Sequence, residues 1–255
     1  MNTANTERQQ ILSKVPEVTA VFWIIKILAT TVGETAGDAV SMSMNLGYLV
    51  GTAIFAVIFM AAVAVQIAAK KFHPVIYWTT IVATTTLGTT IADFADRSLG
   101  IGYTGGSSLL FILLMASLFI WRRVTGSVAV DTVSSPRSEV FYWITIMFSQ
   151  TLGTALGDWT ADSIGLGYGG SAAVFGAMLG LIAVLYYLTK ISHTFLFWAA
   201  FILTRPLGAV VGDFLDKPHN QGGLALSRYS ASAVLLVLIL CCIFFFSHKP
   251  ATRKH

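Results

Sequence analysis

The chain has 255 residues, of which 55% are hydrophobic and only 11% are charged, and its formal net charge is +4. Soluble domains carry about 25% charged residues, so this composition excludes an ordinary soluble protein and indicates an integral membrane protein. The basic residues stand in short clusters between apolar runs, which also argues against a nucleic-acid-binding surface.

Eight apolar runs reach or approach the roughly 20 helical residues that cross a bilayer core. In chain order they cover residues 19–41, 47–69, 74–95, 106–121, 139–161, 170–189, 193–215 and 229–246. They fall into four pairs joined by short Gly-rich turns, and the polar connection 122–138 separates the second pair from the third. We therefore predict an all-α polytopic membrane protein with about eight transmembrane helices.

Four tryptophans mark four copies of one two-helix unit: Trp23, Trp78, Trp143 and Trp198. Counting from the tryptophan as zero, every copy has glycine at position +10 and aspartate at position +15. The extra residues between the second and third copies fall in the middle connection. The simplest history is a unit duplicated twice, giving two four-helix halves at 19–121 and 139–246. Units with an even number of helices all share one orientation in the membrane.

Lysine and arginine concentrate on one side of the predicted membrane. This side holds Arg8, Lys14, Lys70, Lys71, Arg122, Arg123, Arg137, Lys190, Lys249, Arg253 and Lys254, and the other holds Arg97, Lys217 and Arg228. Cytoplasmic loops carry the excess of positive residues. We therefore expect the N-terminal segment 1–18, the connection 122–138 and the tail 247–255 to be cytoplasmic.

A polar stripe runs along the first helix of every unit, because positions +7, +11, +15 and +18 share one helical face. Position +15 holds Asp38, Asp93, Asp158 and Asp213; position +11 holds Glu34, Thr89, Thr154 and Ala209; position +7 holds Thr30, Thr85, Gln150 and Arg205. A second carboxylate set follows one turn later, with Asp96, Asp162 and Asp216. Polar groups inside a membrane face protein or water, so we expect the four first helices to converge and the second helices to face lipid.

Several of these features also have a purely structural interpretation. We expect the tryptophans to anchor helices at the cytoplasmic boundary and the glycines to permit close helix packing. For the second carboxylate set, contact with lipid headgroups is as good an explanation as a functional role. Arg205 lies mid-membrane before Pro206, which should kink or loosen that helix, and should pair with an acid of another repeat. Lys26 is a second charge partner, placed where it can reach the headgroups.

Oxygen atoms dominate the stripe, and oxygen ligands suit hard cations such as Mg²⁺, Mn²⁺ or Ca²⁺. We predict that Glu34, Asp38, Asp93, Asp158 and Asp213 bind a divalent metal cation as a transported substrate. The supporting oxygens would come from Thr30, Thr31, Thr85, Thr89, Gln150 and Thr154. Buried carboxylates can also carry protons, which allows efflux of Mn²⁺ or Mg²⁺ coupled to protons. The sequence shows no nucleophile beside a base and no nucleotide motif, so we predict neither an enzyme nor a covalent cofactor.

Two other functions stay open at this point. One is a transporter or channel for another small solute, either an organic cation or an anion held by Arg205 and Lys26. The other is a non-transporting membrane subunit. Carboxylates outnumber cations in the stripe, which favours the metal cation. The expected partners are the lipid bilayer, the cation and protons, without nucleic acid, and the sequence is compatible with a homo-oligomer.

One pattern recurs in four segments: VFWIIKILATTVGETAGD (21–38), IYWTTIVATTTLGTTIAD (76–93), FYWITIMFSQTLGTALGD (141–158) and LFWAAFILTRPLGAVVGD (196–213). This pattern resembles a family of bacterial membrane proteins built from four tandem copies of a two-helix repeat of unknown function, with one characteristic tryptophan per copy. The resemblance covers nearly the whole chain. It implies a multi-pass protein of the bacterial inner membrane and supplies no substrate.

Overall fold

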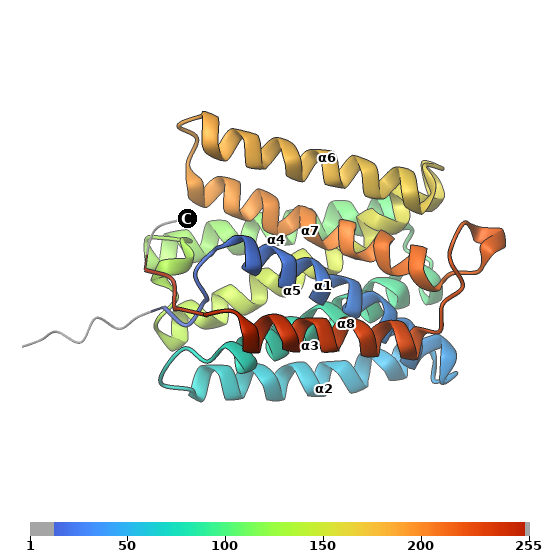
Figure 1. Cartoon of the computed structure of the whole chain (residues 1–255), viewed down its shortest axis with the longest axis horizontal. Coiled ribbons are helices and arrows are strands. Elements are labelled where there is room, and N and C mark those ends of the chain that lie inside the picture. The colour runs from blue at the N-terminus through green and yellow to red at the C-terminus, as the bar shows by residue number, and fades with distance from the viewer. Residues whose placement is uncertain (1–12, 253–255) are drawn as a thin grey trace, which may run out of the picture.

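The computed structural model describes residues 13–252, so Arg8, Arg253 and Lys254 lie outside the described residues. Eight α-helices account for most of this range (Figure 1): α1 (Ala20–Asp38), α2 (Gly47–Ala68), α3 (Pro74–Asp93), α4 (Tyr103–Thr125), α5 (Pro136–Asp158), α6 (Gly167–Leu188), α7 (His193–Asp216) and α8 (Arg228–Phe245). These bounds follow the eight apolar runs closely. The prediction of an all-α fold with eight helices is confirmed.

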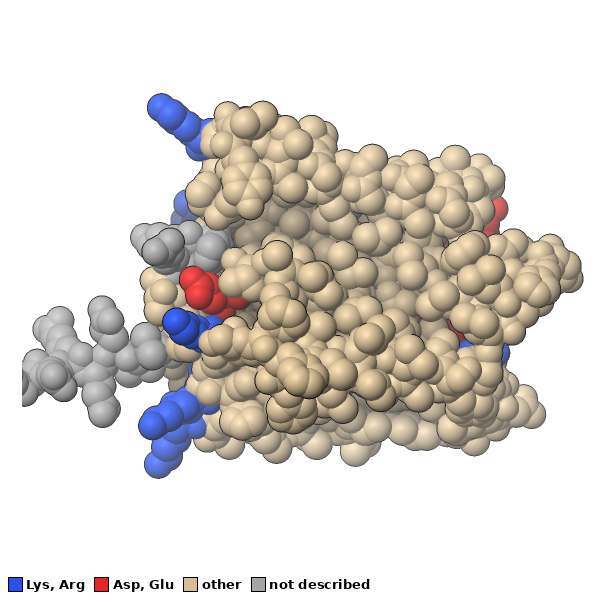
Figure 2. All heavy atoms as spheres, viewed as in Figure 1, with Lys and Arg blue, Asp and Glu red and all other residues tan. Residues whose placement is uncertain are grey.

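Seven of these helices are long and apolar enough to cross a membrane. The exception is α5, which carries Arg137, Glu139, Gln150 and Asp158 and lies largely inside the bundle. Charged side chains on the visible face gather at the two ends of the molecule, and the surface between them is uncharged (Figure 2). The protein therefore has the architecture of a multi-helix membrane protein.

The first helices of the four repeats form a closed ring, in which α1 packs on α3, α3 on α5, α5 on α7, and α7 on α1. The second helices lie outside this ring. Each packs mainly on the first helix of the following repeat: α2 on α3, α4 on α5, α6 on α7, and α8 on α1. In Figure 1, α6 and α2 occupy opposite outer sides. The predicted convergence of the first helices is confirmed.

The glycines at position +10 make this ring possible. A Cβ atom on Gly33, Gly88, Gly153 or Gly208 would collide with the residue at position +7 of the next repeat, which is Thr85, Gln150, Arg205 and Thr30 respectively. The same contact thus recurs four times and closes from the fourth repeat onto the first. Close approach of helix backbones at small residues is the usual basis of packing inside membranes, and the predicted role of these glycines is confirmed.

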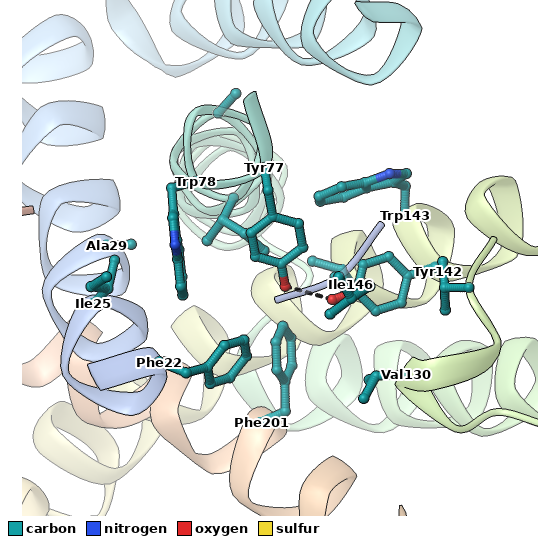
Figure 3. Close-up of a cluster of buried hydrophobic side chains, with 14 of the residues drawn as sticks. Phe22, Ile25, Ala29, Tyr77, Trp78, Val130, Tyr142, Trp143, Ile146 and Phe201 are labelled. Carbon is teal, nitrogen blue, oxygen red and sulfur yellow. Dashed lines mark hydrogen bonds between the residues drawn. The ribbon is translucent and has the colours of Figure 1, made fainter. Parts of the chain in front are cut away.

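Aromatic rings fill the end of the bundle where both described chain ends lie, which we call the termini end (Figure 3). The hydroxyl groups of Tyr77 on α3 and Tyr142 on α5 form a hydrogen bond of 2.6 Å between these neighbouring helices. Trp78 and Trp143 are buried beside them, and Trp198 is buried nearby. The prediction of four interfacial anchors is wrong for these three tryptophans, because they pack in the core; Trp23 alone is partly exposed.

The segment before α1 also belongs to the core at this end. Lys14 forms an ion pair of 2.6 Å with Glu139 of α5, and both side chains are buried. Pro16 pairs with Pro250, so the two ends of the described chain lie side by side. The connection expected to be a polar linker contributes Val130 and Val133 to the same core. The opposite end, where the repeat aspartates lie, is called the aspartate end below.

Candidate functional site

The repeat aspartates stand at a change in helix geometry. Asp38, Asp93 and Asp158 are the last residues of α1, α3 and α5, and each is followed by a five-residue π-helical turn. These turns are Ala39–Ser43, Phe94–Ser98 and Trp159–Ser163. In the fourth repeat α7 continues from Asp213 to Asp216 without such a turn. Short π-helical segments are rare and frequently mark functional sites.

Two cations link the four aspartates in pairs. Lys217 forms ion pairs with Asp213 of its own repeat, at 3.0 Å, and with Asp38 of the first repeat. Arg97 forms ion pairs with Asp93 of its own repeat, at 2.8 Å, and with Asp158 of the third repeat, at 3.6 Å.

Each of these cations follows its own repeat's aspartate by four residues and reaches the aspartate of the next repeat around the ring. The two bridges are therefore related by an approximate twofold symmetry, which matches the two duplicated halves of the sequence.

Asp38 is the most connected carboxylate of this end. Besides Lys217 it lies 3.6 Å from Arg228, which also pairs with Asp216 at 2.8 Å. Carboxylate oxygens of Glu34, Asp38 and Asp93 lie within 4.8 Å of one another, and so do those of Asp38, Asp213 and Asp216. The two groups share Asp38, and each has the spacing of a set of ligands for one metal ion.

The charges of this cluster do not cancel. Five buried carboxylates, those of Asp38, Asp93, Asp158, Asp213 and Asp216, face the three cations Arg97, Lys217 and Arg228. Burial alone would lower the pKa of Lys217, but the carboxylates of Asp213 and Asp38 raise this pKa by more than burial lowers it, so the net shift is upward. With all five acids ionised the cluster carries two uncompensated negative charges.

Arg205 occupies the axis of the ring one layer deeper and is fully buried. Its Nη2 atom lies 2.9 Å from Oε2 of Glu34 and also donates to the hydroxyls of Thr89 and Thr154. One guanidinium group from α7 thus contacts α1, α3 and α5. The expected pairing of Arg205 with an acid of another repeat is present. The helix is not interrupted at Pro206, since α7 continues through it to Asp216.

The predicted supporting oxygens separate into three groups. Thr89 donates to Glu34 at 3.3 Å, and Thr154 accepts from Arg205. Thr30 and Thr31 instead donate to carbonyl groups of their own helix, as hydroxyls in helices commonly do. The remaining members are Thr85 and Gln150, whose polar side-chain atoms are buried without a hydrogen-bond partner among the described residues.

The second carboxylate set does not act as one group. Asp216 joins the charge network, Asp96 is half-buried, and Asp162 is exposed. Lys26 also lies elsewhere than expected. Its ammonium group is fully buried, 4.1 Å from the centre of the Phe201 ring, and makes no ion pair within the described residues. It therefore points into the bundle and not toward the headgroups.

The cations Arg97, Lys217 and Arg228 were not predicted as members of the site and were assigned only to the outer side of the membrane. A local signal was present for two of them, because Arg97 and Lys217 each follow a repeat aspartate by four residues. That spacing places oppositely charged side chains together on a helix. The bridges to Asp158 and Asp38 had no such signal, since they depend on how the ring closes.

These features define a class of protein: an all-α membrane protein of four tandem two-helix repeats, with a network of carboxylates and cations at one end of the helix ring. The family model of the Repeat of Unknown Function DUF347 matches residues 21–72, 76–127, 141–192 and 196–249. The chain belongs to this repeat family, which confirms the resemblance found in the sequence. No curated protein and no solved structure matches the chain significantly.

Proposed function

We propose that the protein transports a hard divalent cation, of the Mn²⁺ or Mg²⁺ type, with the aspartate end as its binding site. The observation that carries this proposal is the cluster of five buried carboxylates and three cations drawn from all four repeats, which with all its acids ionised has two uncompensated negative charges. One divalent cation would neutralise them. Ionisable groups inside a membrane bundle are costly and commonly mark an ion pathway.

The group of Glu34, Asp38 and Asp93 supports the choice of a hard cation. Its oxygens lie within 4.8 Å of one another. Oxygens on opposite sides of a Mg²⁺ or Ca²⁺ ion are separated by twice the bond length, about 4–5 Å. The cluster offers carboxylate oxygens without histidine or cysteine, and such ligands suit Mg²⁺, Mn²⁺ or Ca²⁺ better than Zn²⁺ or Cu⁺.

The internal cations suggest how the ion is released. Lys217 and Arg97 already neutralise part of the cluster, so the site without metal need not hold five bare charges. A bound ion at Asp38 would compete with Lys217 for the same carboxylate. Protonation of carboxylates would weaken metal binding in the same way, which allows exchange of the cation for protons.

The predicted orientation completes the proposal. With both termini cytoplasmic in a bacterial inner membrane, the aspartate end faces the periplasm. The aromatic layer around Tyr77 and Tyr142 then closes the cytoplasmic side. This arrangement corresponds to a transporter with its binding site on the outer side. The proposal includes no enzymatic activity.

Transport by the purified protein in liposomes tests this proposal. We expect wild-type liposomes to take up ⁵⁴Mn²⁺, or Mg²⁺ reported by an internal dye, and Asp38→Asn to reduce the rate at least about tenfold, because the amide keeps the shape and loses the charge. Asp162→Asn is the matched control, since this exposed aspartate lies just after α5. Equal rates for wild type and Asp38→Asn, or no movement of any divalent cation, would refute the proposal.

A further inference from the structure

Between the aromatic layer and Glu34, four side chains at positions +3 and +7 carry polar atoms that have no hydrogen-bond partner within residues 13–252. The atoms concerned are Nζ of Lys26, Oγ1 of Thr85, both amide atoms of Gln150, and Nε and Nη1 of Arg205. All four side chains are fully buried. Native proteins leave only a few such groups unpaired per 100 residues, and each one requires an explanation, such as a water molecule or an ion.

Ring packing places these groups at neighbouring levels. Thr85, Gln150 and Arg205 occupy position +7 in successive repeats, and each lies against the +10 glycine of the preceding repeat. Lys26 lies one helical turn nearer the termini end, about 6 Å along the axis. Its ammonium group sits over the ring of Phe201, which precedes Arg205 by one turn of α7.

The charge of this region is opposite to that of the aspartate end. With Lys26 protonated and Glu34 ionised, Lys26 and Arg205 supply two positive charges and Glu34 supplies one negative charge. The other residues at positions +3, +7 and +11 are uncharged: Ile81, Ile146, Phe201, Thr30, Thr85, Gln150, Thr89, Thr154 and Ala209. The region thus carries a net charge of +1. The aspartates lie about 12 Å from position +7, beyond the Arg205–Glu34 pair.

The free groups also specify the chemistry of a ligand. Lys26, Arg205 and the amide nitrogen of Gln150 are donors, the Thr85 hydroxyl can donate, and only the amide oxygen of Gln150 is restricted to accepting. A water molecule would satisfy some of these donors but would leave the positive charge uncompensated. A small ligand with one negative charge and several acceptor lone pairs satisfies both requirements.

We propose that Lys26, Gln150 and Arg205, with Thr85, form a binding site for one small monovalent inorganic anion of the chloride or nitrate kind. This site lies next to the carboxylate cluster, to which the Arg205–Glu34 ion pair joins it, and its existence does not depend on divalent-cation transport.

The experiment uses the purified full-length protein in detergent, without divalent metal, at constant ionic strength maintained with gluconate. Equilibrium dialysis with ³⁶Cl⁻ should show saturable binding of one chloride per chain. Lys26→Met and Gln150→Leu should each weaken binding about tenfold or more, because hydrogen bonds to a charged ligand are lost. The matched controls are Lys71→Met and Gln221→Leu, whose side chains are exposed, and they should bind as the wild type does.

Thermal unfolding gives a second measurement that remains informative if a variant folds poorly. Chloride should raise the melting temperature of the wild-type protein relative to gluconate, because a ligand that binds only the folded state stabilises it. Absence of saturable chloride and nitrate binding to the wild type would show that the region holds only water and would overturn the proposal. Binding of unchanged affinity in folded Lys26→Met and Gln150→Leu would place the anion elsewhere and overturn it as well.

Discussion

Lys217 and Asp38 lie 179 residues apart in sequence and form a buried ion pair through Nζ and Oδ2. Through this contact the fourth repeat closes onto the first. Arg97 and Asp158 make the corresponding contact between the second repeat and the third. The ring is therefore fastened at two opposite junctions by charge, within the same layer that we propose as the cation site.

Replacement of Lys217 by methionine should destabilise the protein by about 3–5 kcal/mol, because it leaves buried Asp213 without its cation and leaves buried Asp38 with Arg228 alone. Unfolding of the purified variant in detergent measures this loss, and Lys190→Met, at an exposed position, is the control. Added Mg²⁺ or Mn²⁺ should stabilise the variant more than the wild type, since the metal supplies the missing charge. An equal effect of metal on both proteins would contradict a role of Lys217 as an internal counterion of the site.

Arg205 and Glu34 should show strong coupling in a double-mutant cycle. Arg205→Met and Glu34→Gln should each destabilise the protein by about 3–5 kcal/mol, the usual cost of removing one partner of a buried ion pair. The double variant should lose clearly less stability than the sum of the two single losses, because neither charge is then buried without its partner. Thermal unfolding of the four proteins gives the coupling energy. Additive losses would show that the two side chains do not stabilise each other.

Gly153→Ala should destabilise the bundle by about 1–3 kcal/mol, the usual cost of overpacking a tight core. The added Cβ would collide with Arg205 and Pro206 of α7. Gly176 of α6 provides a matched control, because nothing lies within 4 Å of a Cβ atom there. Gly176→Ala should be neutral or stabilising by up to about 1 kcal/mol, from helix propensity alone. Comparable losses at both positions, measured by denaturation in detergent, would contradict the packing role of the +10 glycines.

We predict the orientation in the membrane from the distribution of lysine and arginine, and reporter fusions test it. Green fluorescent protein fused to the C-terminus should fluoresce, whereas alkaline phosphatase at the same position should be inactive, since it requires the periplasm. Alkaline phosphatase inserted after Gly222, in the turn before α8, should be active. The opposite pattern at both positions would reverse the proposed sides of the membrane.

The sequence repeat was sufficient to predict the helices and the convergence of the four first helices. Its polar and apolar positions are local and periodic, so one helix at a time reveals which face is buried. The packing role of the glycines at position +10 was also predictable, because small residues are enriched where membrane helices contact each other. The pairing of Arg205 with an acid was predictable because an unpaired arginine at that depth is too costly.

Contacts between different repeats could not be predicted from this local periodicity. The burial of Trp78 and Trp143 depends on the aromatic layer that forms only when four helices meet. The bridge from Arg97 to Asp158 depends on which helices are neighbours in the ring. The fully buried position of Lys26 likewise follows from the ring geometry, since position +3 alone is compatible with a side chain that reaches the headgroups. Sequence periodicity identifies a buried face, but it does not say which partner covers it.

The packing of each second helix on the following repeat has a consequence for the evolution of the chain. The two helices of one repeat do not pack mainly on each other, so one copy alone would leave its apolar faces uncovered. Separate copies would therefore have to associate as a ring of subunits. Fusion of such subunits preserves every contact. Because Pro16 and Pro250 are adjacent, the ends can be joined and the chain reopened between α2 and α3. A circular permutant of this kind should assemble into the same ring, since the order of the repeats around it has no obligatory starting point.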